Sequence, residues 1–388
     1  MTKATLYAYT SRGQLRSEPV PGQPRQRFYN REDIERLRER KELRRDPSKA
    51  AARGLHWGSP VLESGLTLIQ DGSLYYCGQD ALKLAQERTL EEVAELLWGA
   101  EPTERGHLFE QRPALTANQL ARLRASVKGN ALTLLQTVLP VAGATDLASY
   151  DLSPAGVRLT GARIVRLLAT VVSGRGSGLP VHAALAAAWA PRKPGIGEVL
   201  RMALVLCADH ELNASAFVAR CAASAGASPY DVVSAALATL KGHRHGGATE
   251  RVAALFAEAA TPKRCRSVIA NRLRRGERVP GFGHPLYPAS DPRAALLLKA
   301  AEAAGHRDEW QLARNLSRAG SELLQVHPNL DFGLVAMARA YGLPDHAPLV
   351  LFTLGRTIGW IGHAIEQYNS GELIRPRARY VGPAPKGG

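Results

Sequence analysis

Apolar residues recur at helical spacing through most of the sequence after residue 90, and no other feature limits the fold as strongly. In these segments alanine and leucine dominate positions i, i+3, i+4 and i+7, which is the spacing of one helix face. The segments are 90–98, 117–127, 162–171, 198–207, 214–225, 230–240, 250–259, 294–304 and 349–365. We therefore expect an all-α fold in this part of the chain.

Strand-forming residues are concentrated just in front of the helical region. Leu66–Ile69 and Leu74–Tyr76 flank Asp71-Gly72, a dipeptide typical of two-residue hairpin turns. The sequence therefore predicts a small β hairpin, after which the strand signals fade.

Size and composition narrow the class of protein. A chain of 388 residues is long for one hydrophobic core, so two or three folding units are expected. No uncharged apolar run reaches about 18 residues, which predicts no membrane-spanning helix, and Arg12 in a polar N-terminus argues against a secretory signal. The scattered cysteines, Cys77, Cys207, Cys221 and Cys265, form no CxxC pair; this fits free thiols, a cytoplasmic location and no metal site.

Residues 1–55 differ in charge from the rest of the chain. They hold 14 Lys and Arg against 7 Asp and Glu, a balance of +7 out of a net charge of +15. A short helix at 4–12, a turn-rich, wing-like stretch at 19–24, a charged helix capped by Asn30 and a linker at 46–54 are expected. Such a segment can attract polyanions; a solvated basic helix with its linker is the competing interpretation.

The segment 279–293 carries the most informative pattern. Gly281 and Gly283 leave the backbone bare on both sides of Phe282, so a ligand can approach closely and meet N–H donors. His284 follows directly. An ordinary loop rich in glycine and proline is the alternative.

The same segment ends in a helix-start signal. Asp291 is a possible N-cap and Pro292 suits the first helical turn. Arg293 would then be fixed near the helix start, where its guanidinium suits a carboxylate.

Two further histidines interrupt helical regions. His245 precedes Gly246-Gly247 at the end of an apolar helix, where it can face a cleft; His243-x-His245 alone is weak evidence for a metal. His210 and Asn213 lie within 207–215, where hydrogen-bonded core or helix-end residues are the simpler interpretation.

Three charged residues near the C-terminus are also candidates. Asp331 stands among apolar residues just before a predicted helix at 334–341, where it is either a general base with a raised pKa or a helix N-cap. Arg356 lies on an apolar helix, so it either pairs with a protein carboxylate or receives one from a substrate. Arg375 follows in an Arg-Pro-Arg sequence.

In order and spacing, these segments resemble the citrate synthase family over about residues 56–388. The matching strings are DHELNAS, HGGA, GFGHPLYPASDPRA, PNLDF, GRTIGWIGHAIEQ and RPR. The resemblance implies an all-α homodimer whose subunit has a large domain, 56–246 with 343–388, and a small domain, 247–342, with the active site between them.

The resemblance also implies roles for the candidate residues. Asp331 would take a proton from the methyl group of acetyl-CoA, His245 would stabilise the enol, and His284 would polarise the oxaloacetate carbonyl. His210, Arg293 and Arg356 would bind oxaloacetate, with Asn213 nearby and Arg375 supplied by the other subunit. Val279, Gly281, Phe282 and Gly283 would lie over CoA.

The expected activity is synthesis of citrate from acetyl-CoA and oxaloacetate, with no permanently bound cofactor. Propionyl-CoA, which would give 2-methylcitrate, differs by one methylene, and the sequence does not separate the two. Residues 4–37 resemble the second helix and wing of a MerR-type winged helix-turn-helix, but only three residues precede them. A DNA-binding regulator with a ligand-sensing body is therefore the alternative from another class.

Overall fold

The computed structural model describes residues 6, 9–10, 15–20, 23–30, 33–34, 62–175, 178–378 and 380–383. The chain divides into two compact units, one formed by 64–374 and the other by 1–63 with 375–388. The predicted boundary at residue 55 falls among residues that are not described.

The predicted hairpin is present in the unit 64–374. Strand β3 (Thr67–Gln70) pairs antiparallel with β4 (Ser73–Tyr76), and Asp71 and Gly72 form the turn with φ of 51° and 75°. Positive φ at both turn residues matches the right-handed twist of the strands, which explains the preference for Asp-Gly here. A third strand, β5 (Gln79–Asp80), pairs with β4; with two residues it is too short to give a sequence signal.

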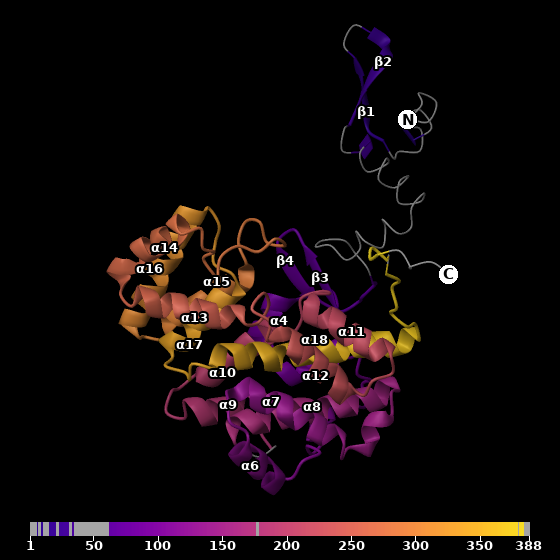
Figure 1. Ribbon diagram of the computed structural model, residues 1–388, viewed down its shortest axis with the longest axis vertical. Coiled ribbons are helices and arrows are strands. Elements are labelled where there is room, and N and C mark those ends of the chain that lie inside the picture. Colours follow the sequence, from indigo (N-terminus) through magenta and orange to yellow (C-terminus); the bar gives the residue numbers. More distant parts are fainter. Residues whose placement is uncertain are drawn as a thin grey trace. The chain divides into compact units, whose positions relative to one another are not determined.

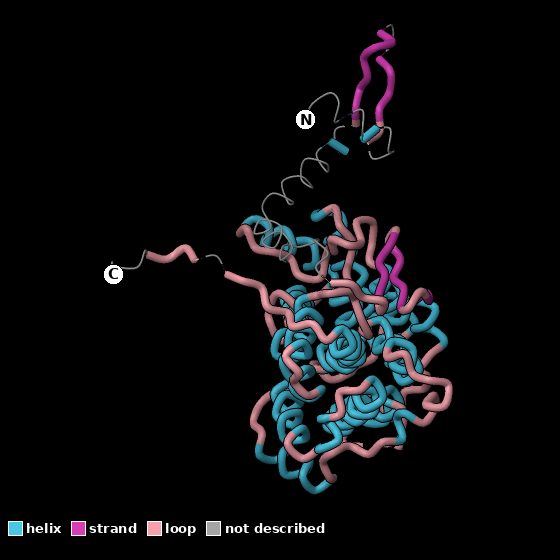
Figure 2. The backbone as a smooth tube through the Cα atoms, turned by 90° about the vertical axis from the view of Figure 1, so that its right-hand side faces the viewer, coloured by secondary structure: helices cyan, strands magenta, loops and turns pink. Residues whose placement is uncertain are grey.

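The rest of this unit is helical, as predicted, with the β3–β4 strands at one edge (Figure 2). The first helices are α4 (Ala81–Glu87), α5 (Leu90–Leu97), α6 (Ala117–Ser126), α7 (Ala131–Gly143), α8 (Pro154–Ser173), α9 (Val181–Trp189), α10 (Ile196–Leu206), α11 (Ala214–Ser224) and α12 (Pro229–Leu240). They are followed by α13 (Ala248–Ala259), α14 (Cys265–Arg274), α15 (Pro292–Ala303), α16 (Arg307–Leu324), α17 (Leu330–Ala340) and α18 (Ala347–Ser370). Three short 3₁₀ turns lie at Leu108–Glu110, Leu147–Tyr150 and Pro262–Arg264.

Several of these helices were not predicted. Helix α16, for example, buries only a narrow stripe, Leu312, Ala313, Leu316, Ala319 and Gly320, among many charged residues. Helix α17 begins at Leu330, four residues before the predicted start. Within the described ranges, no helix is both long and apolar enough to cross a membrane.

Helix α18 is the central element of the unit 64–374, and it runs across the middle of Figure 1 with α8, α10, α11 and α12 packed around it. All residues from Ala347 to Ile365 are buried. A helix that is apolar on every side can be stable only when neighbours surround it. Its position therefore fixes the helices that carry the candidate site.

Two glycines let α18 approach the last turn of α10 and the segment after it. A Cβ atom on Gly355 would lie 2.4 Å from the carbonyl oxygen of Leu204, and one on Gly359 would lie 2.4 Å from that of Ala208. Any side chain at these positions would push the segment after α10 away from α18.

Helices α13–α17 gather on one side of the same unit, in the orange tones of Figure 1. Helix α15 packs on α17, α14 packs on α16, and α13 contacts α16 and α17. These helices lie within the range predicted as the small domain, 247–342; that this range forms a separate domain stays a prediction.

In the other unit, β1 (Ser17–Val20) and β2 (Gln23–Tyr29) form an antiparallel pair where a wing-like stretch was expected. The Asp33 N–H donates to Asn30 Oδ1 over 3.1 Å, which confirms Asn30 as an N-cap. The remainder of the predicted charged helix and linker lies outside the described residues.

We predict that Gly359→Ala lowers the free energy of unfolding by about 2 kcal/mol or more, because the new methyl group cannot fit against the Ala208 carbonyl. Gly197→Ala in α10 is the control: its Cβ would be 3.8 Å from the nearest atom, so the change should be neutral or stabilising by about 1 kcal/mol. Denaturant unfolding measures both, and equal stabilities would contradict the close-packing argument.

Candidate active site

Two of the predicted histidines meet in one cluster. The rings of His210 and His284 lie edge to face with their centroids 4.9 Å apart. His210 Nε2 is 3.1 Å from the hydroxyl of Tyr287, which also packs beside His284. Segments 77 residues apart along the chain thus contribute to the same small polar region.

His284 has a defined proton position. The backbone N–H of Leu286 donates to His284 Nδ1 over 3.2 Å, so Nδ1 is the acceptor and Nε2 carries the hydrogen. Burial and the nearby charge of Arg293 lower the pKa of His284 to about 4. Burial and Arg293 likewise hold the pKa of His210 well below its ordinary value. Both rings are therefore neutral at pH 7, and His284 offers one N–H donor.

Arg293 lies at the start of α15, as predicted, and is paired with Asp291. The Arg293 Nε and Nη2 groups donate to the two Asp291 carboxylate oxygens over 2.9 and 2.8 Å, and both side chains are buried. Asp291 also caps α15 and accepts the Leu330 N–H over 3.0 Å. One carboxylate thus fixes Arg293 and ties the start of α15 to the start of α17.

Asp331 is not a helix N-cap, which was one of its two predicted roles. Asn329 caps α17, accepting from the Phe332 N–H, and Asp331 falls in the first helical turn. Its Oδ1 is buried without a hydrogen-bond partner. Burial raises the pKa of Asp331 to about 7, against the opposing effect of Arg293. A carboxylate held this way is a competent general base near neutral pH.

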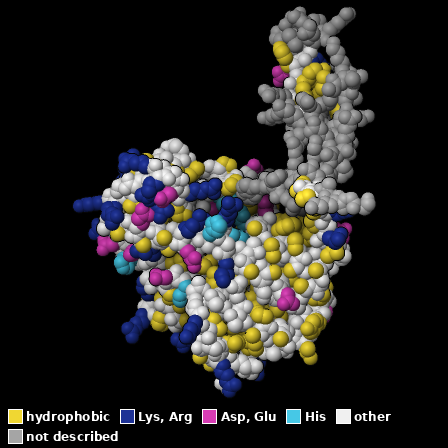
Figure 3. Space-filling view, in the orientation of Figure 1, with side chains coloured by type: hydrophobic (Ala, Val, Ile, Leu, Met, Phe, Trp, Pro, Cys, Tyr) yellow, Lys and Arg dark blue, Asp and Glu magenta, His cyan; other side chains and the backbone are white. Residues whose placement is uncertain are grey.

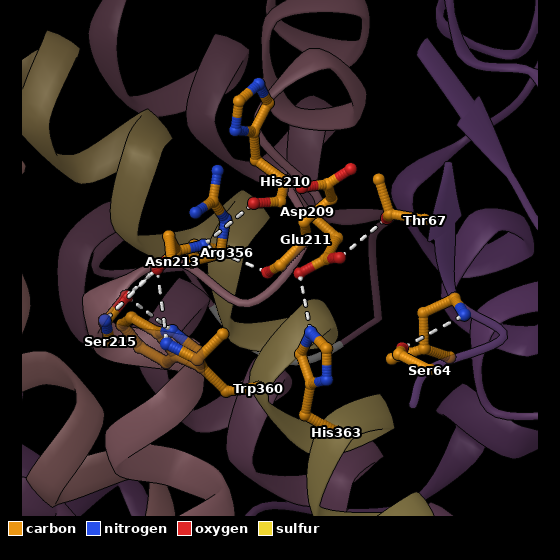
Figure 4. A network of polar contacts seen from close by, with 12 residues as sticks. Ser64, Thr67, Asp209, His210, Glu211, Asn213, Ser215, Arg356, Trp360 and His363 are labelled. Atoms are coloured by element: carbon orange, nitrogen blue, oxygen red, sulfur yellow. Dashed lines mark hydrogen bonds and ion pairs between the residues drawn. The ribbon is translucent and has the colours of Figure 1, made fainter. Parts of the chain in front are cut away.

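His245 belongs to a second polar cluster, shown in part in Figure 4. Ser215 Oγ lies 2.8 Å from both His245 Nε2 and Asn213 Oδ1, and it accepts the Trp360 Nε1–H over 3.0 Å. Asn213 Oδ1 already accepts the N–H groups of Ser215 and Ala216 as the N-cap of α11. The Ser215 hydroxyl donates to Asn213 Oδ1, and His245 Nε2 also lies 3.2 Å from this Asn213 oxygen, so Ser215 and Asn213 together hold the Nε2 side of the His245 ring.

The surroundings of His245 keep it neutral. Burial, together with the charge of Arg356, lowers the pKa of His245 to about 4. Its ring lies edge to face with Phe352 at 6.1 Å, and the Arg356 guanidinium covers the same Phe352 ring at 5.0 Å. His245 and Arg356 thus share one aromatic neighbour.

Arg356 is 1% exposed and its Nε donates to the Cys207 carbonyl over 2.9 Å. Among the described residues no carboxylate forms an ion pair with it. Because a buried guanidinium without an anion is costly, this geometry favours the second predicted role, which is to receive a carboxylate from a ligand.

The predicted CoA loop is tied to the segment before α17. The Gly283 N–H donates to the His327 carbonyl over 2.8 Å, and the Asn329 N–H donates to the Gly281 carbonyl over 2.9 Å. Gly281 and Gly283 have φ of 87° and 72°, which side chains rarely adopt. The side chain of Phe282 packs against Phe332 and the bare backbone of Gly320. The Gly283 N–H, which was expected to be free for a ligand, is thus already hydrogen-bonded within the protein. Val279 packs against the hydrophobic core.

The structure brings most of the predicted site residues into two linked clusters. His210, His284 and Arg293 form one, and Asn213, His245 and Arg356 form the other; Asp331 lies within the electrostatic reach of both arginines. Arg375 begins the segment assigned to the other unit. Its predicted contribution across a subunit interface stays a prediction.

Sequence reasoning missed several residues of these clusters. Tyr287, Ser215 and Trp360 all lie inside the quoted strings, but each looked like an ordinary core or surface residue. A tyrosine three residues after His284 and a serine two after Asn213 are the only signals the sequence offers.

Histidine and basic side chains gather in a hollow between α15 and the β3–β4 hairpin on the face drawn in Figure 3. No group of three or more His, Cys, Asp or Glu within the described ranges is arranged to hold a metal ion. Neutral imidazoles, a carboxylate of raised pKa and buried guanidiniums together suit proton transfer on an anionic organic substrate.

Comparisons with known proteins agree with this class of enzyme. The family model described as "Citrate synthase, C-terminal domain" matches residues 54–377. The citrate synthase of Haloferax volcanii is 34% identical over 363 residues, covering 85% of this chain and 95% of that protein. Citrate synthase 2 of Bacillus subtilis is 28% identical, with 86% and 96% covered.

Solved structures give the same result. Citrate synthase from Thermoplasma acidophilum, in a ternary complex with carboxymethyl coenzyme A and oxaloacetate, aligns with a TM-score of 0.75 and 25% identity, covering 87% of this chain and 97% of that one. The enzyme from Thermotoga maritima aligns with a TM-score of 0.73 and 25% identity, covering 84% and 94%. The chain belongs to the citrate synthase family, and the predicted all-α, citrate-synthase-like fold is confirmed; the predicted helix-turn-helix fragment at the N-terminus is not supported.

We predict that Asp331→Asn makes the protein more stable than the wild type at pH 8. The pKa of Asp331 is about 7 in the folded protein and about 4 when unfolded, so wild-type stability falls as the pH rises between these values. The variant lacks this loss, which is worth up to about 4 kcal/mol.

Thermal unfolding at pH 4.5 and 8 tests this, with exposed Asp308→Asn, in the first turn of α16, as the control. A pH-independent difference between wild type and Asp331→Asn would contradict the burial argument.

Proposed function

We propose that this protein makes citrate by condensing acetyl-CoA with oxaloacetate and water, releasing CoA. The observation that carries the proposal is Asp331, a carboxylate with a buried, unpartnered oxygen and a pKa near 7. Arg293 and Arg356 lie within electrostatic reach of Asp331, and His210, His245 and His284 in the same clusters are neutral. The named relatives support acetyl-CoA, since those compared are citrate synthases.

In the first step, Asp331 takes a proton from the thioester methyl group and His245 donates a hydrogen bond to the thioester oxygen. The proton moves to the carboxylate, the electron pair of the C–H bond forms the C=C bond, and the π electrons of the thioester carbonyl move to its oxygen. A methyl proton next to a thioester is too weakly acidic for a carboxylate alone, so stabilisation of the oxygen must accompany its removal. The Ser215 hydrogen bond orients His245 for this donation.

In the second step, the enol carbon attacks the ketone carbon of oxaloacetate. As the C–C bond forms, the π electrons of the ketone move to its oxygen, where His284 would donate a hydrogen bond from Nε2–H before the oxygen takes up a proton. Two carboxylates of oxaloacetate require cations, and Arg293 and Arg356 supply them, with His210 as a further ligand. Water then hydrolyses the thioester of the product, breaking the C–S bond and releasing CoA and citrate.

The remaining predicted features complete the proposal. Val279, Gly281, Phe282 and Gly283 would contact CoA, and closure of α13–α17 toward α18 would exclude water until condensation is complete. A homodimer would bring Arg375 of a second subunit to the site. The cysteines are free, as expected for a cytoplasmic enzyme.

A DNA-binding regulator is less well supported. The family match begins at residue 54, and most of the region resembling a MerR-type helix-turn-helix lies outside the described residues. The β1–β2 pair with exposed Phe28 fits a wing, but a docking or dimer-stabilising role fits it equally.

We predict that the purified protein releases free thiol from acetyl-CoA only when oxaloacetate is present. A thiol-reactive chromophore measures the rate, with propionyl-CoA as the matched comparison. Because the two acyl groups differ by one methylene, the preference for acetyl-CoA should be about 10- to 200-fold in kcat/KM. No thiol release with either acyl-CoA, together with salt-sensitive DNA binding, would favour the regulator instead.

We predict that Asp331→Asn lowers kcat by about 10³-fold or more, since general base catalysis and its cooperation with His245 are both lost. In the wild type, kcat/KM for acetyl-CoA should fall about tenfold per pH unit below pH 7, because only ionised Asp331 is active. Exposed Asp308→Asn should behave as wild type. A flat profile down to pH 5 would remove Asp331 as the base.

A further inference from the structure

A buried ion pair, between Asp209 and His363, adjoins the site residue His210. His363 Nε2 is 3.3 Å from Asp209 Oδ1, and both side chains are completely buried. Thr67, on strand β3, donates its hydroxyl to Asp209 Oδ2 over 2.6 Å. In Figure 4, Asp209 points toward Thr67 and His363, while the next residue, His210, points the opposite way.

The Asp209–His363 pair is extended by two further charged residues, Glu366 and Arg220, so that negative and positive groups alternate. His363 Nδ1 is 3.5 Å from Glu366 Oε2, which accepts from Arg220 over 2.7 Å, and Glu366 Oε1 accepts the Gly65 N–H over 2.7 Å. Two carboxylates thus face two cations. The two acidic neighbours raise the pKa of His363 to about 9 against the effect of burial, so its ring is positively charged at neutral pH.

This network fixes a segment with an unusual backbone. Cys207–Asn213 connects α10 to α11, and Glu211 within it has a φ of 51°, a conformation that costs free energy for a residue with a side chain. The segment supplies the Cys207 carbonyl that orients Arg356, and it supplies His210 and Asn213. Asp209 is the residue of this segment whose carboxylate meets both Thr67 on β3 and the ring of His363.

The close approach of the Asp209 carboxylate to α18 requires a glycine at position 359. A Cβ atom on Gly359 would lie 2.5 Å from Asp209 Oδ1, so the bare helix surface of α18 is what admits the carboxylate. Tyr76, on β4, donates to the Asp209 carbonyl over 3.2 Å, which holds the backbone of the same residue.

We propose that Asp209 is a positioning residue for oxaloacetate. Its carboxylate, held between His363 and Thr67, sets the backbone of Cys207–Asn213 so that His210 and Arg356 together meet the substrate. The proposal rests on the proposed function for the identity of that substrate. Asp209 touches no reacting atom; it acts through its neighbours in the chain.

The position predicts a selective kinetic effect. His210 and Arg356 are the proposed ligands of oxaloacetate, whereas the proposed CoA contacts lie on the separate loop 279–283. Loosening Asp209 should therefore raise KM for oxaloacetate and leave KM for acetyl-CoA near the wild-type value. A pair that only stabilises the core would lower stability without this selectivity.

The least disruptive test changes Thr67, because the charged pair of Asp209 and His363 stays intact. Thr67→Val removes the hydroxyl at nearly constant volume and should raise KM for oxaloacetate about tenfold. Thr67→Ser keeps a hydroxyl and should restore KM to within about twofold of wild type. Calorimetric titration of oxaloacetate should show the same order of affinities.

A second set of variants tests the ion pair itself. Asp209→Asn, His363→Gln and the double variant should each raise KM for oxaloacetate, with the double variant less affected than the sum of the singles. Asp146→Asn is the matched control, since Asp146 forms another buried pair, with Arg163, away from the site. It should lose stability with both KM values unchanged.

Thiol release by the wild type distinguishes failure of the proposed function from failure of the positioning role of Asp209. If the wild type shows no turnover with oxaloacetate, the proposed function fails. If the wild type is active but folded Thr67→Val and Asp209→Asn keep a wild-type KM for oxaloacetate, the positioning role is wrong. An equal rise in both KM values, or a loss of stability with both KM values unchanged as expected for Asp146→Asn, would also overturn it.

Discussion

The close approach of α18 to the end of α10 and the segment after it is the constraint on which the site depends. Gly355 and Gly359 remove two side chains from one face of a helix that is buried from Ala347 to Ile365, and the backbone of 204–209 occupies that space. This contact places Arg356 against the Cys207 carbonyl and Asp209 against His363. A binding arginine and the chain that carries a binding histidine are thereby fixed by one packing interaction.

The rest of the site follows from a second fixed contact. Asp291 caps α15, holds Arg293 with both carboxylate oxygens and accepts the Leu330 N–H at the start of α17. Asp331 is the next residue, so the helix that carries the proposed base starts from the same carboxylate that holds a proposed substrate arginine. Burial then decides the chemistry, because it makes the histidines neutral and raises the pKa of Asp331 toward 7.

Part of this arrangement is predictable from local sequence rules. The Asp71-Gly72 hairpin, the N-cap at Asp291 and the amphipathic helices obey such rules, since backbone dihedral preferences and side-chain spacing are properties of neighbouring residues. Asp331 shows the limit of these rules. An acidic residue near a helix start is usually a cap, but Asn329 takes that role, and only the packing of α17 reveals that one oxygen of the Asp331 carboxylate is buried without a partner.

The sequence by itself determined which residue types are available and in what order: the helical periodicity, the hairpin and the six strings similar to the citrate synthase family. The tertiary structure alone decided which of them touch. Tyr287 meets His210 across 77 residues, Trp360 meets Ser215 across 145, and His363 meets Asp209 through a gap left by Gly359. Such contacts depend on how helices distant in the chain pack together, and a pKa set by burial exists only once that packing has removed water.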